Sequence, residues 1–283
     1  MTGAITEAII AETTSLAPAK VNLALHVVGK GDGGYHLLDS LMAFAHVGEK
    51  VIVRPAQGLS LLVRGPQARG VPTSRQNLAL RAAVKMGARD LALTLEKHIP
   101  PAAGLGGGSS DAAATMRALA QCQGLPFPAD RGRALGADVP ACLLARAVRV
   151  RGTGEIITPM SLPPLPAVLV NPGVALPTAQ VFQTLRRKQN APLPALPRLT
   201  SVQEACRWFS RQRNDLQTPA MGLAPVIADA LAALSSAPLA RMSGSGATCF
   251  AICVSRQDAQ ALAYRVQAAC PAWWVRATML CQV

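Results

Sequence analysis

The sequence has no long hydrophobic run, although half of its 283 residues are hydrophobic. No apolar stretch reaches the roughly 18 residues that a membrane-spanning helix needs. The first twenty residues contain two glutamates and no basic segment ahead of an apolar core, so they are not typical of a secretory signal. We therefore expect a cytoplasmic protein with no membrane partner, whose N-terminus is a short leader before the first strand.

Paired cysteines and aromatic clusters are also missing. The seven cysteines are an odd number, and no two have C-x-x-C spacing, which predicts reduced, buried thiols. Aromatic residues make up 4% of the chain, and the arginines behind the net charge of +13 are scattered. We therefore expect a soluble basic enzyme with anionic ligands and no nucleic-acid partner, and keep a nucleic-acid-binding protein as the minor alternative.

Glycine, in contrast, is concentrated in the segment "PPAAGLGGGSSDAAATM" at 100–116. Glycine accepts a left-handed backbone and has no Cβ to block a ligand. The alanine-rich residues that follow predict a helix, with Ser109 or Ser110 as its N-cap and Asp111 in its first turn. The free N–H groups at such a helix start bind phosphate, so the segment predicts a phosphate site.

Two common phosphate motifs do not fit these glycines. A Walker loop needs a lysine directly after its last glycine, and a dinucleotide fingerprint needs glycine where Ser109 stands. A flexible turn is the remaining alternative. Four glycines, however, lose about 1 kcal/mol each in order, and a plain turn would not need them.

The pattern of strands and helices indicates an α+β protein, because it lacks the regular alternation of a doubly wound sheet. The segment "KVNLALHVVG" alternates like a half-buried strand. A change in composition places a domain boundary near residue 165, giving domains 1–165 and 166–283. The other expected elements are strands at 49–55, 59–65, 91–100, 166–172, 247–254 and 273–280, a hairpin at "GTG", a short helix at "GADVP", and helices from residue 77, at 110–121, 178–187, 202–212, 224–234 and 258–269, with a surface loop at "NAPLPALPRLT".

Three segments resemble, in the right order, the motifs of the GHMP kinases, a family that includes galactokinase, homoserine kinase and mevalonate kinase. They are "APAKVNLAL" at 17–25, "PPAAGLGGGSSDAA" at 100–113 and "MSGSGATCFA" at 242–251. The resemblance implies the two-domain GHMP kinase fold, with a ribosomal-protein-S5-like N-terminal domain and a ferredoxin-like C-terminal domain. It also implies an ATP-dependent small-molecule kinase, as a monomer or homodimer.

Further sequence segments indicate which acceptor molecule the kinase would phosphorylate. "DGGYHLLDS", "LGADVP" and the triple glycine followed by two serines are similar to those family members that phosphorylate the 2-hydroxyl of a cytidine diphosphate ester of methylerythritol, a step of the non-mevalonate isoprenoid pathway. Homoserine or mevalonate remains the alternative acceptor. The chain departs from some relatives at Ala102 and Ala103, where glycine is expected, so the entry of the loop is stiffer.

Asp138, in "GADVP", is the candidate catalytic base, because a carboxylate near the attacking hydroxyl can accept its proton. From the residues alone, an N-cap or turn aspartate is equally good. The resemblance pairs Asp138 with Lys20, whose ammonium would keep the carboxylate ionised and polarise the hydroxyl. A solvated lysine at a strand end is the alternative for Lys20.

The resemblance also implies binding residues. Asn22, two residues from Lys20, would bind a phosphate or the acceptor hydroxyl; an edge asparagine is nearly as good. For the cytosine we expect Tyr35 to stack, His36 to read the edge and Phe182 to cover the other face, stacking being worth about 1–3 kcal/mol per base. From the residues alone, Tyr35 and Phe182 also fit core positions.

The nucleotide residues complete the prediction. Asn77 and Lys97 resemble positions lining the nucleotide pocket, although a helix N-cap and a strand-end charge explain them equally well. Ser243 to Gly246 would approach the phosphate from the second domain or form a tight strand turn. Mg²⁺ is implied because it neutralises the ATP phosphates; it takes few protein ligands, and Ser110 is the one side chain suggested. The loop residues expected to bind ATP are Pro101, Ala102, Ala103, Gly104, Leu105, Gly106, Gly107, Gly108, Ser109 and Ser110.

Overall fold

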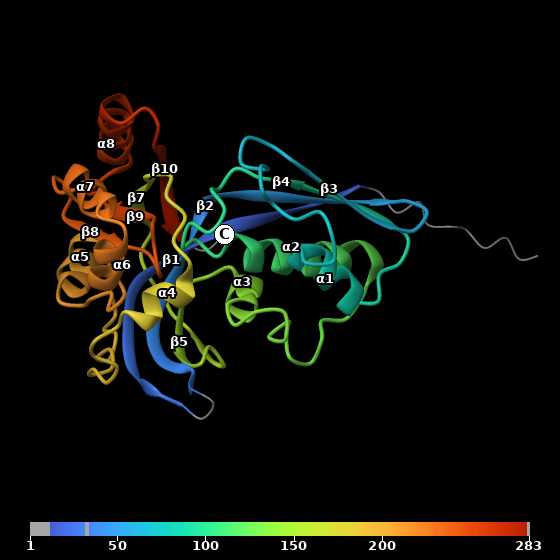
Figure 1. Ribbon diagram of the computed structural model, residues 1–283, viewed down its shortest axis with the longest axis horizontal. Helices are drawn as coiled ribbons and strands as arrows, with labels where there is room; N and C mark the ends of the chain where they lie inside the picture. The colour runs from blue at the N-terminus through green and yellow to red at the C-terminus, as the bar shows by residue number, and fades with distance from the viewer. Residues whose placement is uncertain (1–11, 32–33, 282–283) are drawn as a thin grey trace, which may run out of the picture.

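A computed structural model describes residues 12–31 and 34–281, and the expected N-terminal leader lies outside these residues. The α+β class is confirmed. Within the described part, the strands form one ten-stranded sheet in the order β3-β4-β2-β10-β7-β9-β8, with β1 and β5 also paired to β2 and β6 to β5 (Figure 1). The strands are β1 Thr13–Lys30, β2 His36–Pro55, β3 Leu59–Arg64, β4 Leu91–Glu96, β5 Val148–Gly152, β6 Ile156–Pro159, β7 Leu165–Asn171, β8 Leu239–Met242, β9 Cys249–Ile252 and β10 Trp274–Cys281.

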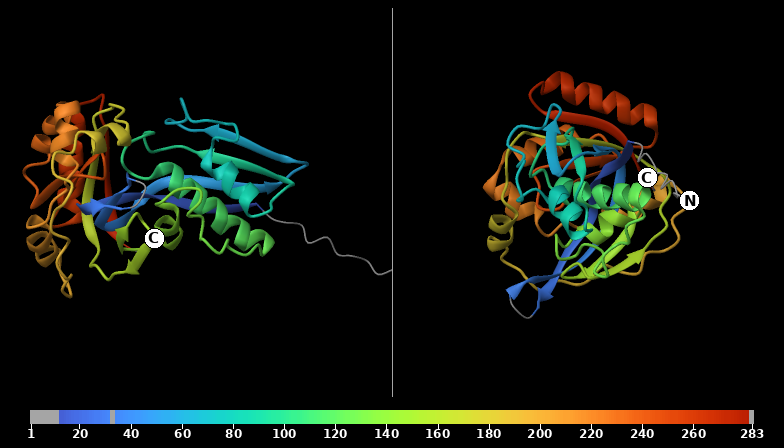
Figure 2. Two further views of the ribbon diagram at one scale, coloured as in Figure 1. Left: turned by 60° about the horizontal axis from the view of Figure 1, so that its bottom comes forward. Right: turned by 90° about the vertical axis from the view of Figure 1, so that its right-hand side faces the viewer.

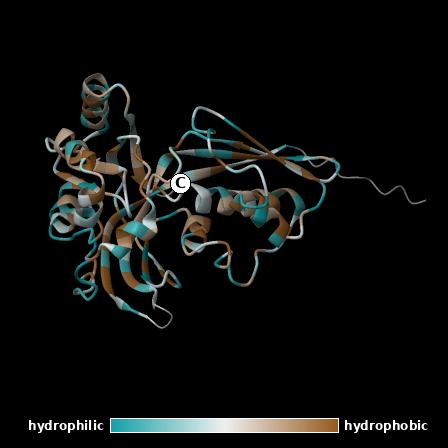
Figure 3. Ribbon diagram, viewed as in Figure 1, coloured by the Kyte–Doolittle hydropathy of each residue, from teal (hydrophilic) through white to brown (hydrophobic). Residues whose placement is uncertain are grey.

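Helices cover this sheet at both ends of the molecule. Figure 2 shows α8 lying beside β10 at one end, whereas α1 and α2 lie together under the strands at the other. Hydrophobic and hydrophilic residues are mixed along α1 and α2 (Figure 3), as expected for helices that bury one face. The helices are α1 Leu78–Lys85, α2 Gly107–Gln123, α3 Val139–Leu144, α4 Thr178–Gln183, α5 Val202–Ser210, α6 Gln217–Leu223, α7 Val226–Ala233 and α8 Arg256–Ala269.

The long antiparallel strands β1 and β2 are the central pair of the fold. The prediction that β1 is half-buried is wrong, because side chains on both of its faces are buried, Asn22 and His26 included. One face joins a hydrophobic cluster at the centre of the molecule, and Leu25 and Val27 join another cluster in the C-terminal half. Irregularities in the pairing, one of them between Asn22 and Ala24, also interrupt a simple alternation of faces.

The expected elements are found with shifted ends, and three were missed. The first half of β2, α6 and β8 were not predicted: β8 has only four residues, and α6 has no strong apolar period of its own. The proline-rich segment at 190–200 has no helix or strand but is not purely a surface loop, since Leu193 and Leu199 are buried in the central cluster. Four of the seven cysteines are buried, and the other three are partly exposed.

The last strand joins the two halves of the chain. β10 pairs with β7 along its length and with β2 at Leu280 and Cys281. The central hydrophobic cluster likewise combines residues of β1 and β2 with residues of β7 and α5. The boundary near residue 165 coincides with the start of β7 and stays a prediction. None of the helices in the described residues has the length and apolarity needed to cross a membrane.

Candidate active site

A cavity of about 630 Å³ lies between the two halves and collects most of the predicted site residues. Its walls come from β1, the segment 99–109, the region before α3, α4 and the turn at 244–245. Of the predicted nucleotide residues, only Ser110 is absent from the described lining. Those that line it are Asn77, Lys97, Pro101, Ala102, Ala103, Gly104, Leu105, Gly106, Gly107, Gly108 and Ser109.

The glycine segment turns sharply into α2. Gly106 is the N-cap, with a left-handed φ of 67°, and the helix begins at Gly107. The prediction of Ser109 or Ser110 as N-cap is therefore wrong, and Asp111 lies beyond the first turn. A left-handed glycine starts the helix three residues earlier than a serine cap would. The first amides of α2, which have no acceptor within a helix, consequently lie in the cavity wall at Gly107, Gly108 and Ser109.

Three hydrogen bonds hold this loop from two sides. The backbone N–H of Lys20 donates to the carbonyl of Leu105 at 2.8 Å, and that of Thr248 donates to Ala103 at 3.2 Å. The Ser243 hydroxyl donates to the carbonyl of Gly104 at 3.2 Å. Because β1 and the β8–β9 turn both grip the loop, its amides are held in place before any ligand arrives.

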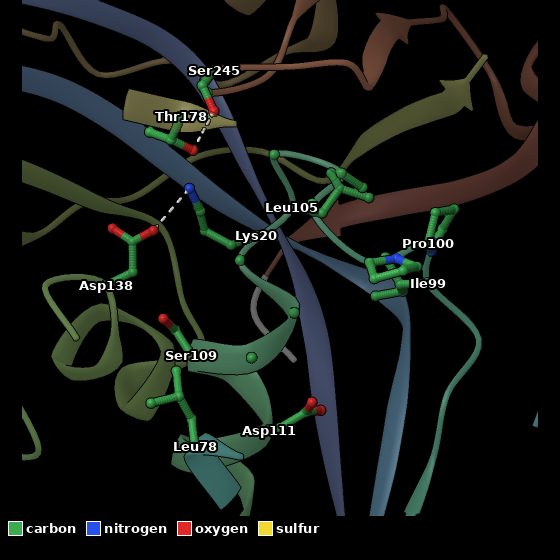
Figure 4. Close-up of a pocket in the computed structure, with 18 of the residues that line it drawn as sticks. Lys20, Leu78, Ile99, Pro100, Leu105, Ser109, Asp111, Asp138, Thr178 and Ser245 are labelled. Carbon is green, nitrogen blue, oxygen red and sulfur yellow. Dashed lines mark hydrogen bonds and ion pairs between the residues drawn. The ribbon is translucent and has the colours of Figure 1, made fainter. Parts of the chain in front are cut away.

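Lys20 and Asp138 face each other across the cavity, above the start of α2 (Figure 4). The Lys20 ammonium lies 3.1 Å from an Asp138 carboxylate oxygen. Asp138 occupies the N-cap position of α3, but in the described structure its side chain makes no capping hydrogen bond. Its carboxylate is 33% exposed, whereas Lys20 is 7% exposed, so Asp138 is open to a ligand that enters the cavity.

Asn22 is buried rather than at an edge. Its side-chain carbonyl accepts a hydrogen bond from the Lys20 ammonium at 2.8 Å. Its backbone N–H donates to the Ser243 hydroxyl at 3.1 Å. Asn22 therefore connects the lysine to the turn that grips the glycine loop.

Comparisons with known proteins agree with this geometry. Models of the "GHMP kinases N terminal domain" and "GHMP kinases C terminal" match residues 77–146 and 193–272. The chain belongs to the GHMP kinase family. All three motif segments of this GHMP kinase contribute to the cavity wall: Lys20 from the first, the glycine loop from the second, and Gly244 and Ser245 from the third.

Two curated relatives of this GHMP kinase carry the same name. The chain is 53% identical over 269 residues to a 4-diphosphocytidyl-2-C-methyl-D-erythritol kinase of Dinoroseobacter shibae, covering 93% of each chain. It is 50% identical over 268 residues to the enzyme of that name from Paracoccus denitrificans, covering 93% of this chain and 95% of the relative.

Solved structures show the same relationship. A crystal structure of 4-(cytidine 5'-diphospho)-2C-methyl-D-erythritol kinase superposes with a TM-score of 0.79 at 35% identity, covering 95% of this chain and 99% of the other. Homoserine kinase from Cytophaga hutchinsonii superposes with a TM-score of 0.67 at 18% identity, covering 100% of this chain and 98% of the other. At that identity the superposition is evidence of the shared fold alone.

The predicted cytosine residues are only partly brought together. His36 and Phe182 stack on each other, with ring centroids 4.9 Å apart, so no base fits between these two rings. Phe182 also lines the cavity, whereas Tyr35 is 72% exposed and lies outside the described lining. Burial lowers the pKa of His36, as do Lys188 and Lys30, which favours the neutral ring.

Lys97 is not a solvated strand-end charge in this GHMP kinase. It is buried, and its ammonium pairs with Glu49 and, at 2.6 Å, with Asp111. Burial lowers the pKa of Lys97, but Asp111 and Glu49 outweigh it, so the net direction is upward. Burial, and secondly Asp111, raises the pKa of Glu49 to about 9. This raised pKa favours the protonated form of Glu49 at neutral pH.

This burial predicts a pH-dependent stability. The folded state holds the Glu49 proton more tightly than the unfolded chain does, so proton binding contributes to the free energy of unfolding. This contribution is complete below the pKa of the unfolded chain and is lost as the pH rises to about 9. The slope is at most about 1.4 kcal/mol per pH unit. Glu49→Gln mimics the neutral carboxyl, so the free energy of unfolding, measured by denaturant titration from pH 5 to 9, should fall less steeply than in the wild type.

Glu96→Gln is the matched control for this prediction. Glu96 lies on β4, one residue before Lys97, but its hydrogen bond with Arg64 lowers the pKa of its carboxyl. It is therefore ionised throughout the measured range, and its replacement should leave the slope unchanged. Equal slopes for Glu49→Gln and the wild type would contradict the protonated state of Glu49.

Several side chains at the site were missed by sequence reasoning. Glu49 is an isolated acidic residue in a predicted strand, and nothing in the sequence indicates that it pairs with Lys97. Asp111 was assigned to the helix dipole instead of to Lys97. Thr178 was missed as well; its hydroxyl lies 2.8 Å from that of Ser245, which belongs to the predicted third-motif turn, in the cavity wall (Figure 4).

Proposed function

We propose that this chain transfers the γ-phosphoryl group of ATP to the 2-hydroxyl of 4-diphosphocytidyl-2-C-methyl-D-erythritol. The observation that carries the proposal is the pairing of Lys20 with Asp138 at 3.1 Å beside the start of α2. It is supported by the curated relatives of that name at about 50% identity over nearly the whole chain.

The proposed reaction uses the cavity as follows. The amides and the dipole at the start of α2 bind the phosphate groups. Asp138 accepts the proton of the acceptor hydroxyl as its oxygen attacks the γ-phosphorus. Lys20 pairs with Asp138 and stabilises the charge that develops on the transferred group.

Ser109 suits Mg²⁺ better than Ser110 does. The Ser110 hydroxyl, suggested from the sequence, is buried and donates to the carbonyl of Pro18 at 2.7 Å, which turns it away from the cavity. Ser109 lines the cavity instead, and its hydroxyl points toward Asp138 (Figure 4). Phosphate and water oxygens with Ser109 suit Mg²⁺, which would neutralise charge on the phosphates.

The remaining parts of the ligands are assigned by position. Asn77 caps α1 by accepting from the N–H of Ala79 at 2.9 Å, and with Lys97 it forms the wall assigned to the nucleotide. Phe182 and His36 are assigned to the cytosine, and Tyr35 would complete this subsite by closing over it. The enzyme is proposed to act in the cytoplasm as a monomer or homodimer.

Release of ADP, coupled to a spectroscopic reaction, tests the acceptor directly. The purified chain is given ATP with the cytidyl ester, homoserine or mevalonate in turn. Turnover with the cytidyl ester alone is expected. Turnover with homoserine or mevalonate but not with the ester would reject the substrate, and tight, salt-sensitive RNA binding without any turnover would favour the nucleic-acid alternative.

A further inference from the structure

Ser40 lies on β2 opposite Leu25 of β1, and its side chain contacts that of Asn22, which in turn bonds Lys20. It is buried and is not among the residues that line the cavity in the described structure. Its hydroxyl lies 2.8 Å from the side-chain nitrogen of Asn22 and 2.7 Å from the carbonyl oxygen of Ala24. Ser40 therefore reaches the site through Asn22.

The direction of each hydrogen bond follows from the chemistry of the groups. A serine hydroxyl has one proton, and the Ala24 carbonyl can only accept, so that proton points to Ala24. The Ser40 oxygen must then accept from Asn22, which sets the amide nitrogen of Asn22 toward Ser40. Its carbonyl oxygen consequently faces the ammonium of Lys20.

A flipped amide would be unfavourable on both sides. The NH₂ of Asn22 would oppose the ammonium of Lys20, and donors cannot pair with each other. The irregular pairing between Asn22 and Ala24 places this contact where bulges often re-aim a side chain. The backbone N–H of Asn22 donates to Ser243, which leaves the orientation of the Asn22 side-chain amide to be set by Ser40.

We propose that Ser40 is a positioning residue for phosphoryl transfer, which locks the Asn22 amide so that the Lys20 ammonium is aimed at Asp138. The proposal rests on the proposed kinase function. Its physical basis is a chain of hydrogen-bonded side chains that runs from Ser40 through Asn22 to Lys20, which pairs with the carboxylate. Of these three, only Asn22 and Lys20 line the cavity. Loss of the lock should slow the chemical step while the binding of ATP is retained.

Ser40→Ala tests the proposal by steady-state kinetics. The variant removes the acceptor for Asn22, and we expect kcat to fall by about tenfold or more, since small misplacements of catalytic groups have such effects. The KM for ATP should stay within about twofold of the wild type, because the glycine loop is untouched. Ser40→Thr keeps one donor and one acceptor on a strand residue and should restore kcat.

The double variant separates positioning from general destabilisation. In an Asn22→Ala background the amide is gone, so adding Ser40→Ala should cause no further loss of kcat. Thr115→Val is the matched control: Thr115 is a buried residue on α2 whose hydroxyl donates to the Asp111 carbonyl. It should lower the melting temperature without changing kcat.

Several outcomes would overturn the proposal. They are an unchanged kcat in Ser40→Ala, an equal further loss in the Asn22→Ala background, or no rescue by Ser40→Thr. If Ser40→Ala does not fold, Ser40→Cys fills the same space with a weak donor and acceptor, and full kcat there counts against the lock. A wild type that fails to phosphorylate the ester would instead reject the proposed function.

Discussion

Asp138→Asn is expected to abolish turnover. An amide cannot accept the proton of the acceptor hydroxyl, and loss of a general base lowers kcat by about 10²–10⁴-fold. ATP affinity should remain close to that of the wild type, because the proposed phosphate site is formed by the amides of α2 and not by this carboxylate. Steady-state kinetics and isothermal titration with a non-hydrolysable ATP analogue measure the two effects separately.

The Lys85–Asp130 pair offers a matched control. Its ammonium and carboxylate lie 3.3 Å apart, and each side chain is about one-third exposed, but the pair lies outside the described cavity lining. Asp130→Asn should leave kcat unchanged. Should Asp138→Asn keep more than about a tenth of the wild-type kcat, Asp138 is not the essential base.

Gly104→Ala is expected to damage both stability and nucleotide binding. Gly104 has a left-handed φ of 74°, and a Cβ there would lie 2.7 Å from the backbone oxygens of both Gly246 and Ser243. The conformation alone costs about 1–3 kcal/mol for a residue with a Cβ, and the clash adds to it because backbone cannot swing aside. The loop must then move away from the third-motif turn, which would displace the amides that are proposed to bind phosphate.

Gly124→Ala separates conformational strain from this close approach. Gly124 caps the other end of α2 with a left-handed φ of 65°, and no described atom lies within 4 Å of a Cβ added there. It should lower the melting temperature but leave the affinity for the ATP analogue intact. Equal analogue affinity in Gly104→Ala and Gly124→Ala would show that the grip of the third-motif turn on the loop is not needed for binding.

The two halves of the chain share a hydrophobic core, so we do not expect a large hinge motion between them. Relative domain movement is expected where an interface is small and polar. Here the shared cluster contains the fully buried Leu23, Leu41, Leu169 and Phe250, contributed by strands of both halves. Lys20 and Asp138 both belong to the N-terminal half and lie 3.1 Å apart, so their pairing does not depend on a movement between the halves.

Local patterns predicted the parts of the site that depend on local chemistry. Glycines ahead of an alanine-rich helix predicted the phosphate loop, and Asn77 was correctly placed at the start of a helix. The pairing of Lys20 with Asp138 needed the family resemblance, because 118 positions separate the two residues (138 − 20) and no period or spacing connects them.

Tertiary contacts decided what the sequence patterns could not. The helix start at Gly106 instead of a serine depends on the left-handed turn that β1 and the β8–β9 turn impose. Strand β1 reads as half-buried by its alternation, but the two halves of the chain pack on both its faces. The burial of Glu49 against Lys97 and Asp111 joins three separate elements, so no local pattern could indicate it.

A crystal structure of the chain with a non-hydrolysable ATP analogue and the cytidyl ester tests the central claim most directly. We predict the phosphates at the amides of Gly107, Gly108 and Ser109, and the 2-hydroxyl oxygen of the ester within about 2.6–3.2 Å of an Asp138 oxygen. Phosphates bound away from the start of α2, or a 2-hydroxyl beyond the reach of Asp138 with both ligands in place, would contradict it.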